Sequence, residues 1–182
     1  KGWRVLQLER DRHPRFHIGE SLLPCNLPIL EQLGVLEKVE AIGVLKRGAD
    51  FPSAPGEYQT FQFSRALGPS PDHSFQVKRE EFDQILFENA RASGVDAREQ
   101  VGVTSVEVEA LGSIRAMARE ADGKQLSIAA RYVIDASGRD TVLGKQFRLK
   151  QKNAEHQSAA IFAHFESVER RPGEDAGNIS IY

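Results

Sequence analysis

The sequence contains little of several features that mark particular classes of protein. Its 182 residues include a single cysteine, Cys25, and carry a formal net charge of −2, with Lys and Arg scattered along the chain. One cysteine excludes an internal disulfide framework and a cysteine-based metal site, so we expect no metal centre of that kind. A balanced charge without basic clusters argues against nucleic acid as a partner. No apolar run approaches the ~20 residues of a membrane-spanning helix, and we expect no stable membrane insertion.

The two ends of the chain carry few signals of their own. The opening residues KGWRVLQLER lack the apolar core of a secretory signal. With the single cysteine, this favours a cytoplasmic location. The chain opens directly on a strand-like run and closes on the alternating segment GNISIY, whereas a strand normally finishes in a turn. These two features predict that the chain is a piece of a longer protein.

The apolar pattern predicts two helical regions. Residues 26–43 (NLPILEQLGVLEKVEAIG) have leucines at helical spacing and predict one or two short helices, interrupted or capped at Gly34. Residues 77–95 (VKREEFDQILFENARASGV) predict the clearest helix, with an apolar stripe on one face and Gly94 after the last turn. Between these regions, residues 58–63 (YQTFQF) predict a short strand.

Other segments predict further strands. Residues 3–10 (WRVLQLER) predict a strand covered on both faces. Three consecutive strands follow the second helical region, with a hairpin turn at Asp122-Gly123. The last of these strands loses its alternation at residues 132–134, which predicts that it re-enters a covered sheet. We expect residues 145–157 to form a polar loop, and the segments AAIFAHFESV and NISIY to form two more strands.

Three polar segments stand where these elements are predicted to end. Glu9 closes the first strand, where a carboxylate can accept hydrogen bonds from ribose hydroxyls. In HIGES, Gly19 permits close backbone approach to a ligand, while Glu20 and Ser21 equally suit the cap of the following helix. DASGR, which begins at Asp135, can present a carboxylate and bare backbone N–H groups to a dinucleotide. Alone, each segment also fits an ordinary strand end or turn.

In this order, the three segments resemble FAD-dependent oxidoreductases of the glutathione-reductase-like fold. Within them the chain is most similar to flavin-dependent halogenases and the related geranylgeranyl reductases. The resemblance covers nearly the whole chain, and PRFHIGESLLP (Pro14–Pro24) is its most specific motif. It implies an α/β fold: a partial FAD/NAD(P)-binding Rossmann domain, an antiparallel β-meander and the start of a substrate-domain sheet. The implied division is an FAD-binding part over 1–150, with 44–76 contributing to the substrate side, and a substrate-binding sheet beginning in 151–182.

The resemblance also assigns residues to the cofactor. In the family, the carboxylate matching Glu9 holds the adenosine ribose, and the loop matching HIGES lies beside the flavin. The cofactor-binding residues implied in this sequence are Glu9, Arg10, Gly19, Glu20, Ser21, Arg79, Asp135 and Gly138. The Gly-rich phosphate loop that normally precedes the ribose-binding carboxylate by about 20 residues does not fit before Glu9. We therefore expect this chain alone to bind FAD weakly or not at all.

One lysine is carried over as a catalytic residue. In the halogenases, a flavin hydroperoxide oxidises halide, and a lysine holds or orients the resulting hypohalous acid against an aromatic substrate. Lys46 in LKRGADF matches that lysine by position. An amine suits this role because it donates hydrogen bonds and, when burial lowers its pKa, becomes nucleophilic. A solvated lysine beside a loop is the alternative interpretation.

The implied function is that of an FAD-dependent monooxygenase that halogenates an aromatic substrate. FAD is the expected cofactor, its reduced form supplied by a flavin reductase or NAD(P)H, with chloride as a further candidate. The expected substrate is a small or carrier-bound aromatic molecule. A reductase of the geranylgeranyl type and an aromatic hydroxylase are alternatives on the same fold, and a non-catalytic α/β binding module is a third. The sequence leaves the substrate, the halide and the oligomeric state open.

Overall fold

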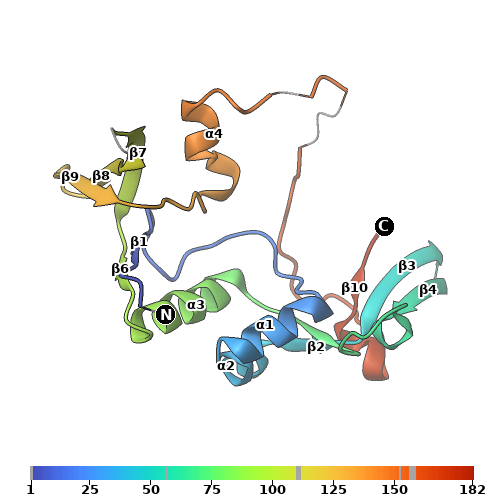
Figure 1. The fold of residues 1–182 in the computed structure, drawn as a ribbon. Helices are drawn as coiled ribbons and strands as arrows, with labels where there is room; N and C mark the ends of the chain where they lie inside the picture. Colours follow the sequence, from blue (N-terminus) through green and yellow to red (C-terminus); the bar gives the residue numbers. More distant parts are fainter. Residues whose placement is uncertain (1, 56, 110–111, 152, 156–158) are drawn as a thin grey trace. The chain divides into compact units, whose positions relative to one another are not determined.

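The computed structural model describes residues 2–55, 57–109, 112–151, 153–155 and 159–182 (Figure 1). The chain divides into two compact units. Unit 1 combines Lys1–Arg12 with Val95–His164, and unit 2 combines His13–Gly94 with Phe165–Tyr182. The secondary structure is a mixture of short helices and strands, as the α/β prediction requires.

Unit 1 contains a parallel strand pair and an antiparallel meander. In the pair, β1 (Leu6–Leu8) lies beside β6 (Asp96–Arg98). The meander has the order β7 (Val101–Val108), β8 (Ile114–Glu120) and β9 (Gln125–Ala130). The turn between β8 and β9 falls at Asp122-Gly123, as predicted, because Gly123 adopts a φ of +90°.

Unit 1 also contains a short helix that the sequence did not predict. This helix, α4 (Val142–Gln146), follows a 3-10 turn, η4 (Gly138–Asp140). It overlaps the beginning of the predicted polar loop of residues 145–157. The Gln146 side chain fixes α4 to the meander, because its Oε1 accepts from the Val106 amide at 2.9 Å and its Nε2 donates to the Val106 carbonyl.

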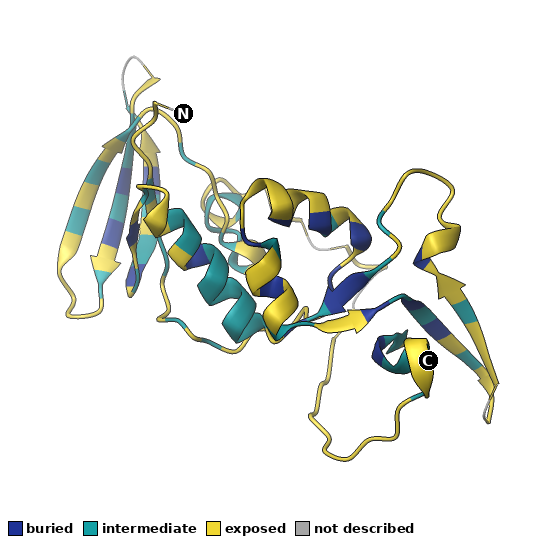
Figure 2. Cartoon of the chain, turned by 90° about the horizontal axis from the view of Figure 1, so that it is seen from below, coloured by how far each residue is buried: buried dark blue, intermediate teal, exposed yellow. Residues whose placement is uncertain are grey.

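Unit 2 contains the larger helices. They are α1 (Leu27–Gln32), α2 (Leu36–Ile42) and α3 (Arg79–Ala92), and a 3-10 turn, η1 (Pro24–Asn26), precedes them. The predicted break between α1 and α2 is confirmed at Gly34, which has a φ of +70°. Both helices expose most of their surface and bury only a narrow stripe (Figure 2).

The strands of unit 2 form two small sheets. In one, β2 (Val44–Lys46) pairs antiparallel with β5 (Ser74–Gln76). In the other, β3 (Gly48–Ala54) lies between β4 (Glu57–Gln62) and the C-terminal strand β10 (Ile179–Ser180). Two 3-10 turns accompany these sheets, η2 (Phe63–Arg65) and η5 (Gly173–Gly177). The predicted strands over 58–63 and within NISIY are therefore confirmed.

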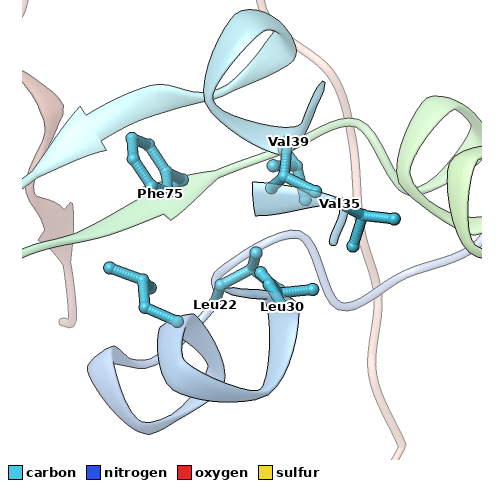
Figure 3. Packing of buried hydrophobic residues seen from close by; sticks show 7 residues of the cluster. Leu22, Leu30, Val35, Val39 and Phe75 are labelled. Atoms are coloured by element: carbon cyan, nitrogen blue, oxygen red, sulfur yellow. The ribbon is translucent and has the colours of Figure 1, made fainter. Parts of the chain in front are cut away.

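The apolar core of unit 2 lies between its helices and one face of the β2–β5 pair. Leu22, Leu30, Val35, Val39 and Phe75 converge there (Figure 3). Leu86 and its neighbours on α3 pack against this cluster. Val35 and Val39 are fully buried. The helical stripe read from the sequence therefore serves to hold the helices against the sheet.

Three strand predictions were wrong in part. The first strand spans only Leu6–Leu8 and is not buried, because among the described residues it pairs with β6 alone. Residues 132–134 do not re-enter a sheet: β9 ends at Ala130, and Ile134 is 90% exposed. The segment AAIFAHFESV contains no strand, and Ile161 is 99% exposed. The apolar residues are present in all three segments, but within the described parts of the chain the first has a strand on one side only and the other two have none.

Candidate functional site

Lys46 is the most unusual residue of unit 2, because its side chain is almost entirely buried. It stands at the end of β2 and is 1% exposed. Its Nζ donates a hydrogen bond to Ser21 Oγ and lies 5.8 Å from the centre of the Phe63 ring. Burial lowers the pKa of the Lys46 amine, because the charged form is poorly solvated there. The alternative of a solvated lysine is therefore wrong.

The strand register explains how Lys46 reaches Ser21. Lys46 lies directly opposite Ser74 on β5, and Ser21 forms an isolated bridge to Gln76 on the other edge of β5. Directly opposite residues, and residues two apart on a strand, point to the same side of a sheet. Lys46, Ser74 and Ser21 therefore share one face, while Phe75 points to the apolar core on the other. The long lysine side chain crosses β5 on the polar face.

The segment Glu20–Leu22 is held as an extra strand beside β5. The Leu22 amide donates to the Phe75 carbonyl at 3.0 Å, and the Val77 amide donates to the Glu20 carbonyl at 2.8 Å. The following 3-10 turn is not capped by Glu20 or Ser21; the Asn26 side chain accepts from the Leu23 amide instead, at 2.7 Å. The capping interpretation is therefore wrong, and the Ser21 hydroxyl is directed to Lys46.

Gly19 lies against the guanidinium of Arg79. Its φ of +111° is one that L side chains rarely adopt, and an added Cβ would stand 2.9 Å from Arg79 Nη1. Arg79 Nη1 donates to the carbonyls of Ile18 at 3.1 Å and Gly19 at 3.4 Å. Arg79 begins α3, as predicted. The structure therefore brings together two of the predicted cofactor residues, Gly19 and Arg79.

Asp83 holds Arg79 in place and was missed by sequence reasoning. Arg79 donates to both carboxylate oxygens of Asp83, from Nε at 2.7 Å and from Nη2 at 3.0 Å. Arg15 donates to the same carboxylate at 3.2 Å. The Asp83 side chain is only 11% exposed. The four-residue spacing of Arg79 and Asp83 on a predicted helix is the signal that could have revealed this pair.

Arg79 mainly holds the loop that contains Gly19 in place, which is compatible with a role in FAD binding. Four of its hydrogen bonds go to Asp83, Ile18 and Gly19, which leaves one of its five N–H groups to donate elsewhere. The Gly19 backbone, held without a side chain, leaves the loop open to close approach by a flat ring. His17 hydrogen-bonds the neighbouring Ile18 carbonyl through its Nδ1, at 2.7 Å, as a loop histidine does.

Glu9 and Arg10 belong to unit 1. The Glu9 backbone continues the ladder after β1, since its amide donates to the Arg98 carbonyl at 2.8 Å. Its Oε1 accepts from the Asp11 amide at 2.9 Å, which orients the carboxylate at the strand end. Arg10 Nη1 donates to Asp140 Oδ2 at 2.6 Å. Asp140 lies in η4, so this pair joins the strand end to the DASGR region.

The carboxylate of Asp135 forms hydrogen bonds to residues that follow it in the chain. Its carboxylate accepts from the Ser137 amide at 3.0 Å, from the Ser137 hydroxyl at 2.5 Å and from the Leu143 amide at 2.9 Å. These bonds lower the pKa of Asp135, the Ser137 hydroxyl most strongly. Gly138 adopts a φ of +59° at the start of η4. The DASGR motif is therefore a turn tied together by its first carboxylate, with its Gly backbone exposed.

Unit 2 contains a second buried charge, which the sequence analysis did not predict. Asp50 on β3 is 1% exposed, and its Oδ1 accepts from Arg171 Nη1 at 2.7 Å and from Thr60 at 2.7 Å. Asn178, just before β10, also donates to this oxygen, at 3.3 Å. These contacts link β3 to the segment of residues 165–182. They could not be predicted from the sequence, because the two segments are more than 100 residues apart along the chain.

The predicted site residues are thus divided between the units. Unit 1 carries Glu9, Arg10, Asp135 and Gly138, and unit 2 carries Gly19, Glu20, Ser21, Lys46 and Arg79. Glu20 is exposed. Within the described residues, no group of three or more His, Cys, Asp or Glu side chains is arranged to hold a metal ion. No helix of the described chain is long and apolar enough to cross a membrane.

A family model described as "FAD binding domain" matches residues 2–180. This chain belongs to that FAD-binding family. The match covers nearly every described residue, including both the Gly19–Arg79 contact and the DASGR turn. The predicted family, cofactor class and fold class are confirmed.

This member of the FAD-binding family is similar to halogenases. It is 31% identical to a 1H-pyrrole-2-carbonyl-[peptidyl-carrier protein] chlorinase of Pseudomonas fluorescens, over 93% of this chain and 42% of the relative. It is also 31% identical to a tryptophan 2-halogenase of Chondromyces crocatus, over 100% and 34% respectively. The solved structure of the myxobacterial chondrochloren halogenase CndH, an FAD-dependent halogenase, matches with a TM-score of 0.76 at 32% identity, over 98% of this chain and 42% of that one. The chain thus spans less than half the length of these relatives.

Proposed function

We propose that this member of the FAD-binding family is part of a flavin-dependent halogenase that transfers an oxidised halogen to an aromatic substrate. The observation that carries the proposal is the almost complete burial of Lys46. The family resemblance of the sequence matches this lysine to the active-site lysine of the halogenases. Its relatives support the same reaction class, since they are named as a pyrrole-carrier-protein chlorinase and a tryptophan halogenase. When bound, reduced FAD would supply the electrons with which O2 is activated to oxidise halide.

The residues of the chain have distinct proposed roles toward FAD. Arg79 fixes the loop at Gly19, so that the loop backbone can lie beside the isoalloxazine ring. Glu9 accepts hydrogen bonds from the adenosine ribose at the end of β1. The DASGR turn, held by Asp135, presents the Gly138 backbone as a further proposed contact to FAD. Arg10, Glu20 and Ser21 complete the proposed set.

Lys46 is proposed as the residue that holds hypohalous acid against the substrate. Burial favours the neutral amine, which has a lone pair available, while its N–H groups remain donors. Chloride and a separate flavin reductase belong to the proposal as the halide and the source of reduced flavin. One relative is a chlorinase of a pyrrole carried on a peptidyl-carrier protein. This supports the proposal that the substrate here is an aromatic molecule, either free or bound to a carrier protein.

The domain division expected from the resemblance is part of the proposal. Residues 44–76 would contribute to the substrate side, and the substrate sheet would begin in 151–182. The pairing of β10 with β3 supports this, since it joins the end of the chain to the strand that follows Lys46. The part of the protein that completes the substrate site would come from chain outside these residues, and we place the protein in the cytoplasm.

The proposal is tested by Lys46→Ala in the full-length protein, with reduced FAD, chloride and aromatic substrates. We expect halogenated product to fall by about 10²-fold or more, because the loss of one preorganised hydrogen-bond donor costs about 10²–10³-fold, while O2-dependent oxidation of reduced flavin continues. Lys38→Ala is the matched control, since Lys38 is an exposed lysine on α2. Unchanged halogenation in Lys46→Ala would remove the lysine from the mechanism. Absence of any halogenated product from the unaltered protein would favour the reductase or hydroxylase alternatives.

A further inference from the structure

The polar face of the β2–β5 pair contains two serines with different surroundings. Ser21 Oγ accepts the hydrogen bond of the buried Lys46 amine. Ser74, directly opposite Lys46, is fully buried, and its hydroxyl has no hydrogen-bond partner among the described residues. The Lys46 side chain therefore passes over the nearer serine and ends at the more distant one, on the far edge of β5.

This choice of partner fixes where the amine lies. A lysine side chain is flexible and loses much rotamer freedom when it is immobilised. Burial alone does not select one position for Nζ, whereas a hydrogen bond to a rigid acceptor does. Ser21 is such an acceptor, because backbone hydrogen bonds on both sides, at Glu20 and Leu22, hold it to β5.

We propose that Ser21 is a positioning residue for Lys46: its hydroxyl fixes the amine on the polar face of the β2–β5 pair, in the orientation that halogenation requires. The inference rests on the proposed function for its catalytic consequence. The physical contact between the two residues does not depend on that function. A serine hydroxyl suits both charge states of the amine, since it accepts from the ammonium form and donates to the neutral form.

The loop that bears Ser21 also bears Gly19. Arg79 binds the carbonyls of Ile18 and Gly19, so the same short segment is held by the guanidinium and by β5. Ser21 thereby links the segment proposed to lie beside the flavin to the lysine proposed to receive the oxidant. The position of Nζ is set relative to that segment rather than by β2 alone.

The contact is tested by a double-mutant cycle on thermal stability in the full-length protein. The variants are Ser21→Ala, Lys46→Met and the pair of both. We expect Ser21→Ala to lower the melting temperature by about 4 °C in the unaltered background, because a buried amine loses its acceptor. In the Lys46→Met background we expect almost no change. Equal losses in the two backgrounds would overturn the inference.

Ser74→Ala is the matched control. It removes a serine hydroxyl from the neighbouring position on the same face, but that hydroxyl bonds to no described residue. We expect its effect on stability to be the same with Lys46 present or replaced. A Lys46-dependent loss in Ser74→Ala as large as that in Ser21→Ala would contradict the special role of Ser21.

A second experiment measures how much halogenated product forms for each molecule of reduced flavin that is oxidised. In Ser21→Ala we expect halogenated product per flavin oxidised to fall about tenfold, with a matching rise in hypohalous acid captured by a trap in solution. Ser21→Thr retains the hydroxyl and should restore the ratio. If Lys46→Ala abolishes halogenation while Ser21→Ala leaves the ratio unchanged, the inference fails and the proposed function stands. If Lys46→Ala leaves halogenation unchanged, the proposed function fails, and the stability cycle still decides the contact.

Discussion

Replacement of Gly19 by alanine tests whether the loop beside Arg79 is fixed by backbone and side chain together. A non-glycine residue at a φ of +111° costs about 1–3 kcal/mol in strain. In addition, the new Cβ would stand 2.9 Å from Arg79 Nη1, so the guanidinium must move. Movement weakens the hydrogen bonds of Nη1 to the carbonyls of Ile18 and Gly19, which adds about 1 kcal/mol.

Gly34→Ala is the matched control for backbone strain. Gly34 lies in the same unit with a φ of +70°, and an added Cβ there meets no atom within 4 Å. We therefore expect Gly34→Ala to lose about 1–2 kcal/mol of unfolding free energy. Gly19→Ala should lose roughly 2–4 kcal/mol, the sum of strain and weakened Arg79 contacts.

The assay is urea denaturation of the full-length variants together with FAD titration. A loss of about 1.4 kcal/mol in cofactor binding corresponds to a tenfold weaker Kd, and we expect at least this for Gly19→Ala and none for Gly34→Ala. Equal stability losses and equal FAD affinities in the two variants would refute the reasoning, because Gly19 would then matter only for its φ.

Two further predictions concern charged groups outside the Lys46 region. Arg171→Met leaves the carboxylate of Asp50, which is 1% exposed, without its cation, and we expect the free energy of unfolding in urea to fall by about 2–4 kcal/mol. Arg119→Met, which replaces an exposed arginine, is the control. An equal loss in the two variants would contradict this prediction. The Asp135 pKa is lowered in the folded chain. The contribution of this carboxylate to folding stability is therefore full above the ordinary carboxyl pKa of about 4 and is lost as the pH falls through the lowered value. The protection of the α4 amides against hydrogen exchange, relative to their intrinsic exchange rate at each pH, should therefore fall in acid, and Asp135→Asn should remove that fall. The same fall in both proteins would exclude Asp135 as its source.

The local signals of the sequence predicted most of the helices and the meander. The break at Gly34, the helix over 79–92 and the turn at Asp122-Gly123 depend on conformational preferences of the residues themselves. Such preferences act over a few residues and can therefore be recognised in the sequence without knowledge of the fold. The apolar runs at 132–134 and 159–168 were misleading for the same reason, because apolar residues form a strand only where a neighbouring strand accepts their hydrogen bonds.

The sequence by itself determined the family, through the order of its motifs, and it determined the position of Lys46 along the chain. Only the tertiary structure decided that this lysine is buried and that Ser21, 25 residues earlier, holds its amine rather than capping a helix. It also decided that Asp50 meets Arg171 across 121 residues. Burial and hydrogen-bond partners depend on which distant segments pack together, and no local pattern of residues records that packing.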